Sequence, residues 1–478
     1  MTTNIDSHNP VSGEVVWSGP ISTPTKVEQA IHLAHHQLAS WRTTKLADRV
    51  DLVPNYASYL KKNADEVADL MCWEVGKLRW DSSGEVAAAI AKAELSIQAL
   101  QQRRSKLVAG DGNSPQRTVR YAPIGVALVL GPYNFPLHLP GGQIIPALLA
   151  GNTVVFKPSD QATAVGQWML EAWRRVGLPE HVLQLIVGGV ETAITAIESP
   201  KINGVYLTGG LEAGRAIHRQ LAGRPEVLLA LELGGNNPVV VMPDADPQGV
   251  ANNLSFSAFI STGQRFTCAR RAKFVEGDST SQQIEALVKI TNQLRVGLPG
   301  DQPVPHLGPL ISSAAAEKIE STYKQLQQLG CHPILPWQSD RQADCLAHPA
   351  ILEAVDLDDD ARRMIGEMEW FGPLLVIERF PNFEAACQAA ADTPYGLAAS
   401  LLGGSAELFE QFVNQVGAGV VNWNGPTTGA AGVLPFGGLG ASGNHRPAGF
   451  HAIDFCSDPI ASLQRTEFTD GDPWSVAK

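Results

Sequence analysis

The sequence has few cysteines, no excess of basic residues and no long apolar run. No two of its cysteines are spaced as C-x-x-C and none belongs to a Cys/His cluster of zinc-finger type. Isolated thiols of this kind are typical of a reducing compartment. The net charge of -12 argues against partners that need a basic surface, namely nucleic acids and anionic membranes. Because no 18-residue apolar run occurs, we expect no membrane span. The six cysteines are Cys72, Cys268, Cys331, Cys345, Cys387 and Cys456.

The length and the composition describe an ordinary globular protein. The chain has 478 residues, of which 44% are hydrophobic and 18% are charged, so we expect two or three domains with a large core. Such a core needs no metal or disulfide to stabilise it, and no metal site is expected. The first residues, MTTNID, have neither a basic region nor an apolar core, so they do not predict a signal peptide. A cytoplasmic protein is the simplest expectation.

The apolar spacing predicts helices first and then an alternation of strands and helices. Thr23 and Pro24 are typical of a helix start, and helical patterns cover roughly 45–61, 64–75 and 83–103. From 124 onward, short apolar runs near 124–130, 153–156, 182–187 and 203–207 alternate with helical stretches. A second such region extends from about 234 to 430. Strands that alternate with helices predict an α/β fold with a parallel sheet covered on both faces.

Two segments carry the most specific signal. Residues 263–271 read GQRFTCARR, and residues 231–237 upstream read LELGGNN. In this order they resemble the active site of the aldehyde dehydrogenase family, in which the later segment reads Gly-Gln-x-Cys and the Cys is the nucleophile. Here that position holds Phe266. The resemblance implies that Glu232 is the general base, which activates the water that cleaves a thioester and helps to deprotonate the thiol.

Further motifs extend the resemblance over nearly the whole chain. Residues 131–136, GPYNFP, resemble the family segment whose Asn donates to the oxygen that becomes negative during attack, a role implied here for Asn134. Residues 435–438, PFGG, with Gly443 match the C-terminal signature of the family. The fold implied is that of an aldehyde dehydrogenase, with a Rossmann-like dinucleotide-binding domain, an α/β catalytic domain and a small β oligomerisation element.

Three segments resemble the dinucleotide site of the family. In KPSD (157–160) the Lys of the family bonds the adenosine ribose, and a nearby acid assists; this acid would repel a 2′-phosphate, which favours NAD over NADP. In LTGGLEAG (207–214) a helix start would face the pyrophosphate, although the family commonly has Ser where Gly210 stands. In EWFGP (369–373) the Glu contacts the nicotinamide ribose and the Phe packs beside the ring. The cofactor residues implied are Lys157, Ser159, Asp160, Gly209, Gly210, Gly214, Glu369 and Phe371.

Within the family, several segments resemble the N-succinylglutamate 5-semialdehyde dehydrogenases. The most distinctive are VNWN (421–424) and GASGNHRP (440–447), which in the family lie near the substrate. The resemblance implies that His445 or Arg446 meets a substrate carboxylate. The chain departs from this subfamily at Gly142, where the subfamily has Asn, and at Phe266.

The substitution at Phe266 decides the expected activity. A phenyl ring cannot attack an aldehyde, and it would fill space that the substrate carbon needs. Cys268 is an unpromising substitute: in extended backbone it would point to the same side as Phe266 but lie about 7 Å farther along, and alignment for catalysis tolerates only about 1 Å. The subfamily also has Cys at this position, so a buried structural role is expected for it.

Three hypotheses therefore stay open. In the first, the protein has kept dinucleotide binding and lost aldehyde oxidation, and acts as a regulatory or structural partner. In the second, it is an active NAD-dependent semialdehyde dehydrogenase that uses Cys268 after a loop shift. In the third, it has another activity on the same scaffold, such as slow hydride transfer from an aldehyde hydrate with Glu232 as the base, or ester hydrolysis.

The resemblance also implies a domain division. The dinucleotide-binding domain would comprise residues 1–105 and 124–233, and the catalytic domain residues 234–430. The oligomerisation element and the tail would comprise residues 106–123 and 431–478. Family members assemble through that element, so a homodimer or homotetramer is expected, with a small aldehyde, or no small molecule, as the further partner.

Overall fold

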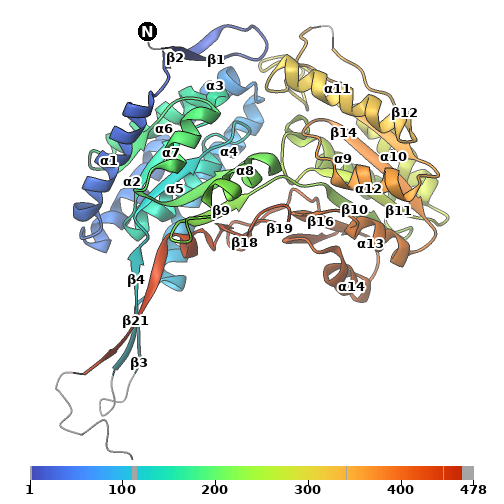
Figure 1. Ribbon diagram of the computed structural model, residues 1–478. Coiled ribbons are helices and arrows are strands. Elements are labelled where there is room, and N and C mark those ends of the chain that lie inside the picture. Colours follow the sequence, from blue (N-terminus) through green and yellow to red (C-terminus); the bar gives the residue numbers. More distant parts are fainter. Residues whose placement is uncertain (1–2, 110–115, 341, 445, 466–478) are drawn as a thin grey trace, which may run out of the picture.

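The computed structural model describes residues 3–109, 116–340, 342–444 and 446–465. Figure 1 shows two α/β lobes side by side, with a long β-ribbon that projects from the first lobe. The model thus confirms the predicted α/β class. No helix in these ranges is long and apolar enough to cross a membrane.

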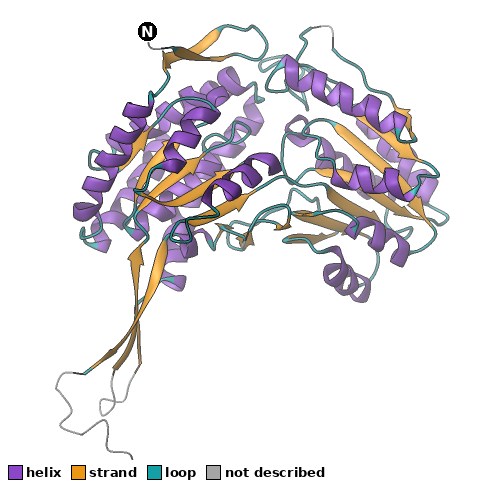
Figure 2. Cartoon of the chain, viewed as in Figure 1, coloured by secondary structure: helices purple, strands orange, loops and turns teal. Residues whose placement is uncertain are grey.

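The first lobe is built on a five-stranded parallel sheet in the order β7-β6-β5-β8-β9. Alternate residues of β5 belong to two different cores, because successive side chains of a strand point to opposite faces. Helices α2 to α6 cover one face, and α1, α7 and α8 cover the other (Figure 2). The strands are β5 (Val126–Leu130), β6 (Thr153–Lys157), β7 (Leu183–Leu185), β8 (Ile202–Thr208) and β9 (Leu228–Glu232). The helices are α1 (Pro24–Trp41), α2 (Leu46–Lys62), α3 (Ala64–Val75), α4 (Arg79–Arg103), α5 (His138–Ala150), η1 (Asp160–Ala162), α6 (Thr163–Arg175), α7 (Val190–Glu198) and α8 (Leu211–Leu221).

The second lobe contains a seven-stranded sheet in the order β12-β13-β14-β11-β10-β16-β17, parallel except for the β12–β13 pair. Helices α9 and α10 pack on one face, and α11 to α14 pack on the other. The strands are β10 (Asn237–Val241), β11 (Ala269–Val275), β12 (Cys331–Leu335), β13 (Ala350–Ala354), β14 (Leu374–Phe380), β16 (Ala398–Leu402) and β17 (Val420–Trp423). The helices are α9 (Pro247–Phe259), η2 (Ile260–Gly263), α10 (Thr280–Asn292), α11 (Ser313–Gln328), α12 (Asp359–Glu367), α13 (Phe383–Ala391) and α14 (Ala406–Val416).

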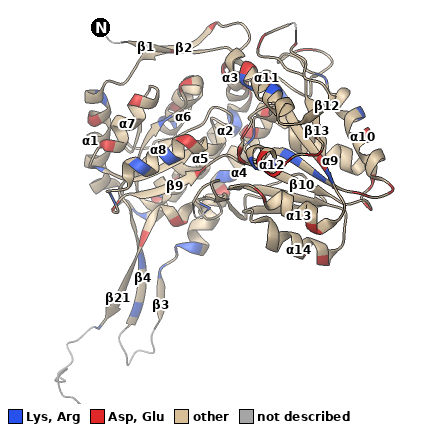
Figure 3. Ribbon diagram, turned by 45° about the vertical axis from the view of Figure 1, so that its right-hand side comes forward, with Lys and Arg blue, Asp and Glu red and all other residues tan. Residues whose placement is uncertain are grey.

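The projecting ribbon is a three-stranded antiparallel sheet in the order β21-β4-β3. It joins β3 (Leu107–Ala109) and β4 (Gln116–Pro123) to β21 (Ser457–Gln464) from the far end of the sequence. Short pieces near the site complete the chain: β15 (Tyr395–Gly396), β18 (Pro435–Phe436), β19 (Leu439–Gly440), β20 (Ala448–Gly449) and η3 (Ala452–Phe455). Acidic and basic side chains are interspersed over both lobes (Figure 3).

A hairpin and a helix are among the elements without a counterpart in the predictions. The chain begins with an antiparallel hairpin, β1 (Asn4–His8) and β2 (Val15–Pro20), ahead of the predicted first helix. β1 (NIDSH) is largely polar, and β2 (VVWSGP) has its apolar residues in succession, so neither strand has the apolar alternation that predicts a strand. Helix α12 was also missed, because its sequence DDARRMIGE has few apolar residues.

Candidate active site

The candidate residues converge where the two sheets meet. The carboxyl ends of β6, β8 and β9 lie at one edge of the first sheet, and the chain passes from Glu232 at the end of β9 to Asn237 at the start of β10. Asn237 is in register with Ala269, at the start of β11. The segment around Phe266 therefore leads into the second sheet beside the exit of the first. Open α/β sheets bind their ligands outside the carboxyl ends of the strands.

Lys157 ends β6 and is almost completely buried. Its ammonium donates to the carbonyl oxygens of Pro158 and Gly188, both at 2.8 Å. Burial lowers its pKa, and the carboxylate of Asp160 acts in the opposite direction. Asp160 is exposed, and the hydroxyl of Ser159 donates to it at 3.4 Å. These residues present a cation and an anion together at the end of one strand.

The turn after β8 leaves open space at the start of α8. The Gly209 N–H donates to the carbonyl oxygen of Glu232 (3.0 Å), so this N–H extends the hydrogen bonding between β8 and β9. Gly210 is the N-cap of α8, and a Cβ placed there would meet no atom within 4 Å. At Gly214 a Cβ would come within 2.7 Å of Leu233, so this glycine lets the helix pack closely on the strand exit. A helix start that faces open space is suited to an anionic group.

Glu369 lies directly over the turn between the two sheets. Its carboxylate accepts from the Gly235 N–H (3.1 Å), and a Cβ at Gly234 would lie within about 2 Å of its oxygens. Burial raises the pKa of Glu369, and the guanidinium of Arg270 opposes that shift. Phe371, two residues on, packs edge-to-face on Tyr133 with ring centroids 6.2 Å apart. The glycine at 234 thus makes room for this carboxylate.

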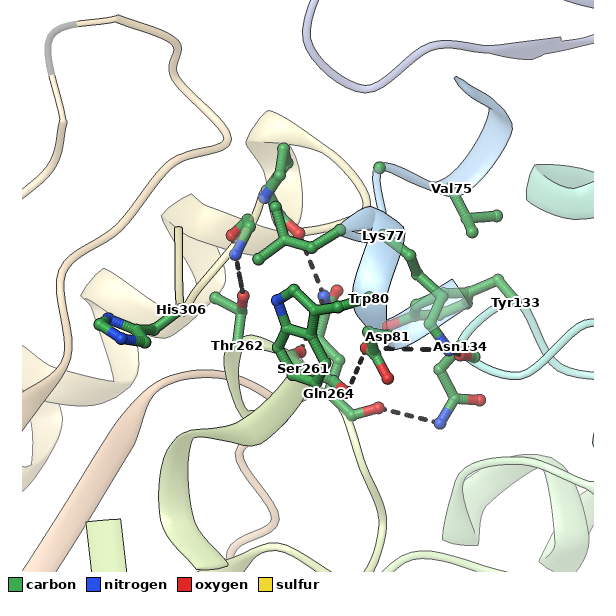
Figure 4. Close-up of a pocket in the computed structure, with 14 residues that line it drawn as sticks. Val75, Lys77, Trp80, Asp81, Tyr133, Asn134, Ser261, Thr262, Gln264 and His306 are labelled. Carbon is green, nitrogen blue, oxygen red and sulfur yellow. Dashed lines mark hydrogen bonds and ion pairs between the residues drawn. The ribbon is translucent and has the colours of Figure 1, made fainter. Parts of the chain in front are cut away.

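Asn134 follows β5 and contacts the segment that contains Phe266. Its side-chain Nδ2 donates to the backbone carbonyl oxygen of Gln264 at 2.9 Å, and its backbone carbonyl oxygen accepts from the Lys77 ammonium at 3.1 Å. An amide has two N–H donors, so one remains after the bond to Gln264. Figure 4 shows Asn134 and Gln264 beside a cavity of about 20 Å³ that is also lined by Trp80 and Asp81.

Phe266 is half-buried, and its ring packs against the ring of Phe436, with centroids 5.8 Å apart and an interplanar angle of 59°. Its backbone carbonyl accepts from Asn237 at 2.7 Å. The Cys268 N–H donates to the carbonyl oxygen of Arg265 (3.0 Å), so the chain turns here. The prediction of extended backbone between 266 and 268 was therefore wrong; a tight turn, held by Asn237, separates the two side chains instead.

Cys268 is completely buried. Its thiol donates to the carbonyl oxygen of Ile260 (3.7 Å), at the end of α9. Burial raises the pKa of this thiol, and the guanidinium groups of Arg270 and Arg265 oppose the shift. A raised pKa disfavours the thiolate, which is the reactive form.

Glu232 is 4% exposed and lies at the last position of β9. Its Oε1 accepts from Gln143 Nε2 of α5 at 2.9 Å, whereas its Oε2 has no partner among the described residues. Burial raises the pKa of Glu232 to about 7, and the ammonium of Lys92 acts against this rise. A carboxyl group whose pKa is near neutrality is suited to proton transfer.

Comparison with known proteins identifies the family to which the chain belongs. The model of the aldehyde dehydrogenase family matches residues 1–459. The chain belongs to the aldehyde dehydrogenase family. It is 40% identical over 463 residues to N-succinylglutamate 5-semialdehyde dehydrogenase of Acinetobacter baylyi, an alignment that covers 96% of this chain and 93% of the relative. These matches confirm the family and the subfamily resemblance seen in the sequence.

Solved structures of the family share the fold. A 1-pyrroline-5-carboxylate dehydrogenase from Thermus with bound NAD superposes with a TM-score of 0.89 and 27% identity, covering 97% of this chain and 90% of that one. Glyceraldehyde-3-phosphate dehydrogenase GapN from Methanocaldococcus jannaschii, complexed with NADP, superposes with a TM-score of 0.88 and 26% identity. The match covers 97% of this chain and 99% of that one. The aldehyde dehydrogenase family uses a nicotinamide cofactor, and this chain is similar both to a structure with bound NAD and to one with bound NADP.

The remaining predicted residues lie near the C-terminal part of the site. Arg446 adopts a left-handed backbone conformation (φ 53°), and its Cα lies against Gly437, where a Cβ would come within 2.6 Å. His445 lies outside the described residues. An antiparallel bridge between Glu232 and Gly443 brings this loop to the end of β9.

Three residues that the sequence analysis did not single out shape the site. Gln143 donates a hydrogen bond to Glu232, and Asn237 donates one to the carbonyl oxygen of Phe266 in the turn. Lys92 carries a buried charge that acts on Glu232. Gln143 and Lys92 lie inside helices, without a motif around them. Asn237 lies within the quoted LELGGNN segment, so its motif was the one available signal.

Proposed function

We propose that this chain is a family member that binds a nicotinamide dinucleotide but has lost thiolate-dependent oxidation of aldehydes. The observation that carries the proposal is the Phe266–Phe436 contact: two aromatic rings pack where the resemblance expects a thiol. Thioester chemistry requires a nucleophile with an accessible lone pair. A benzyl side chain supplies none.

The dinucleotide would be held by groups on three elements. The helix start at Gly210 would face the pyrophosphate, Lys157 the adenosine ribose and Glu369 the nicotinamide ribose. The open space at Gly210 and the glycine that accommodates Glu369 support this assignment. We propose NAD rather than NADP, because the exposed Asp160 beside Lys157 would repel a 2′-phosphate. Asp160→Ser should then narrow the difference between the affinities for NAD and NADP.

Cys268 is the alternative nucleophile, and its surroundings do not favour that role. The thiol is buried, bonded to the carbonyl of Ile260 and has a raised pKa. Asn237 Nδ2 holds the turn by donating to the carbonyl oxygens of Phe266 and Cys268, at 2.7 and 2.8 Å. The thiol could reach a substrate only if these hydrogen bonds were broken. An active enzyme that uses Cys268 therefore needs a rearranged loop.

The surroundings of Glu232 favour a second candidate activity. Its Oε2, which has no partner in the described part of the chain, and its near-neutral pKa suit it to taking a proton from water or from an aldehyde hydrate. In the latter reaction the hydrate would lose a hydride to the dinucleotide and a proton to Glu232, giving a carboxylic acid. Ester hydrolysis would use the same base, with the remaining N–H of Asn134 as an oxyanion donor.

The substrate class is proposed from the relatives. The Acinetobacter relative is named for a semialdehyde that carries carboxylates. Arg446, beside Gly437, is the residue we propose to meet such a carboxylate, and its Arg446→Gln variant should weaken binding of succinylated semialdehydes more than that of uncharged aldehydes.

A homodimer or homotetramer is proposed through the β-ribbon. Leu107 and Val108 of β3 and Ile460 and Leu463 of β21 are exposed, with exposed fractions of 45 to 71%. Apolar side chains on a projecting sheet are typical of a protein interface. The Leu463→Lys variant should elute at a lower mass in size-exclusion chromatography with light scattering.

One set of measurements tests the function. Binding of NAD and NADP is measured by calorimetry, and NADH production by absorbance at 340 nm with a panel of aldehydes that includes succinylglutamate semialdehyde. Binding without turnover supports the proposal and fits a regulatory or structural role. Turnover that Cys268→Ala abolishes would contradict it in favour of Cys268, and turnover that survives that change would support Glu232 chemistry. Absence of dinucleotide binding would refute the cofactor assignment.

A further inference from the structure

Lys92 is a buried lysine on α4 without a role in any motif of the chain. It is 6% exposed, and its ammonium donates to the carbonyl oxygen of Gly449 at 2.8 Å. An ammonium has three N–H donors, so this neutral carbonyl leaves part of its bonding capacity unused. A buried charge is costly unless an opposite charge lies close to it.

The side chain of Lys92 approaches the same part of α5 that Glu232 contacts. A Cβ at Gly142 would lie 3.5 Å from Lys92 Cε, so the aliphatic stem passes over this glycine. The next residue, Gln143, donates to Glu232 Oε1. Lys92 from α4 and Glu232 from β9 thus reach neighbouring positions of one helix, and Glu232 Oε2 has no partner among the described residues.

The other titratable groups around Lys92 do not supply a counter-charge at neutral pH. Burial lowers the pKa of His138 to about 4, with a further contribution from Lys92, so that imidazole is neutral. Burial raises the pKa of Cys456 to about 12, so that thiol is protonated. Of the described groups that act on Lys92, Glu232 is therefore the one able to be an anion at pH 7.

We propose that Lys92 is a positioning residue that holds Glu232 in its carboxylate form and therefore sets the pH range in which Glu232 can act as a base. Burial pushes both groups toward their neutral forms, lowering the pKa of Lys92 to about 8 and raising that of Glu232 to about 7, while each charge stabilises the other. Two buried groups that interact in this way titrate as a pair. Gly142, which departs from the subfamily, lies beside the stem of the lysine.

The test is a carboxyl titration of the full-length protein. The protonated carboxyl band of Glu232 is followed by infrared difference spectroscopy between pH 4.5 and 9 and is assigned by its loss in Glu232→Gln. In Lys92→Met, which keeps the length and the apolar stem, we expect the proton affinity of Glu232 to rise at least tenfold. The control Glu94→Gln removes an exposed charge from the same helix and should leave the midpoint unchanged. A change of less than twofold in folded Lys92→Met would overturn the proposal.

A reciprocal measurement keeps the test decisive if Lys92→Met does not fold. Coupling between two sites is mutual, so Glu232→Gln should lower the proton affinity of Lys92 at least tenfold. This is read from the ε-carbon resonance of ¹³C-labelled lysine, which is assigned by Lys92→Arg. An unchanged lysine titration would refute the coupling. The proposal rests on the role proposed for Glu232, but neither titration uses dinucleotide or turnover, so its failure is distinguishable from failure of that function.

Discussion

The edge of the first sheet and the turn at Phe266 differ in what their side chains can do, although they lie side by side. Lys157 and Gly210 at the sheet edge, with Glu369 over the adjoining turn, provide charge, open space and a helix start, which are features that a dinucleotide needs. At the turn, Phe266 provides an aromatic ring packed on Phe436, and the nearby thiol of Cys268 is buried.

The residues proposed to bind the dinucleotide and the position proposed to have lost its nucleophile therefore lie on separate elements of this fold. Lys157 and Gly210 are held by the end of β6 and the start of α8, and Glu369 by the loop between α12 and β14, whereas Phe266 is held by Asn237 and the start of β11. A single substitution in the turn can therefore remove the proposed covalent step and leave the binding elements in place.

The largest expected effect is a gain of activity in Phe266→Cys. If the rest of the site is competent, NADH production from a semialdehyde should rise about 10³-fold or more, the reverse of the loss that follows removal of a covalent nucleophile. The control Phe266→Ala removes the ring without adding a thiol and should stay inactive. Equal activity in both variants would show that the ring acts by blocking the site rather than by lacking sulfur.

A second prediction concerns the buried base at the sheet edge. The pKa of Glu232 is raised to about 7 in the folded protein, so its contribution to stability is present below pH 4.5 and is lost as the pH rises to 7. Over this range wild type should lose on the order of 3 kcal/mol of unfolding free energy relative to Glu232→Gln. Urea unfolding of both proteins at pH 5 and 7.5 measures the difference; parallel pH profiles would show that Glu232 is not buried in solution.

The next effect should appear in dinucleotide binding alone. In Gly234→Ala the new Cβ would lie within about 2 Å of the Glu369 carboxylate and displace it, so we expect about tenfold weaker binding, near 1.4 kcal/mol. Gly223→Ala, where a Cβ meets nothing within 4 Å, is the matched control. Calorimetric titration with NAD compares the two, and equal affinities would remove Glu369 from the site.

The smallest effect is expected for the thiol of Cys268. Because it is buried and bonded to Ile260, Cys268→Ala should leave dinucleotide affinity unchanged and aldehyde-dependent NADH production at the wild-type level. Mass spectrometry after brief iodoacetamide treatment of wild type should show no modification at Cys268. Rapid labelling there would mean that the turn opens readily and would reduce the contrast between the two regions.

The sequence by itself determined the family and the α/β alternation, because both are written in local patterns. Turns such as LTGG and KPSD follow strands, and their glycines and charged residues mark strand ends whatever the rest of the chain does. The same local reasoning failed at β1, β2 and α12, where the apolar residues are few or do not alternate.

Tertiary structure alone decided the surroundings of Glu232 and Phe266. The bond from Gln143 to Glu232, the passage of Lys92 over Gly142 and the packing of Phe266 on Phe436 join segments that are 50 to 170 residues apart. The turn between 265 and 268 likewise depends on Asn237 from another strand. Burial and electrostatic coupling arise when such segments pack together, so no local pattern contains them.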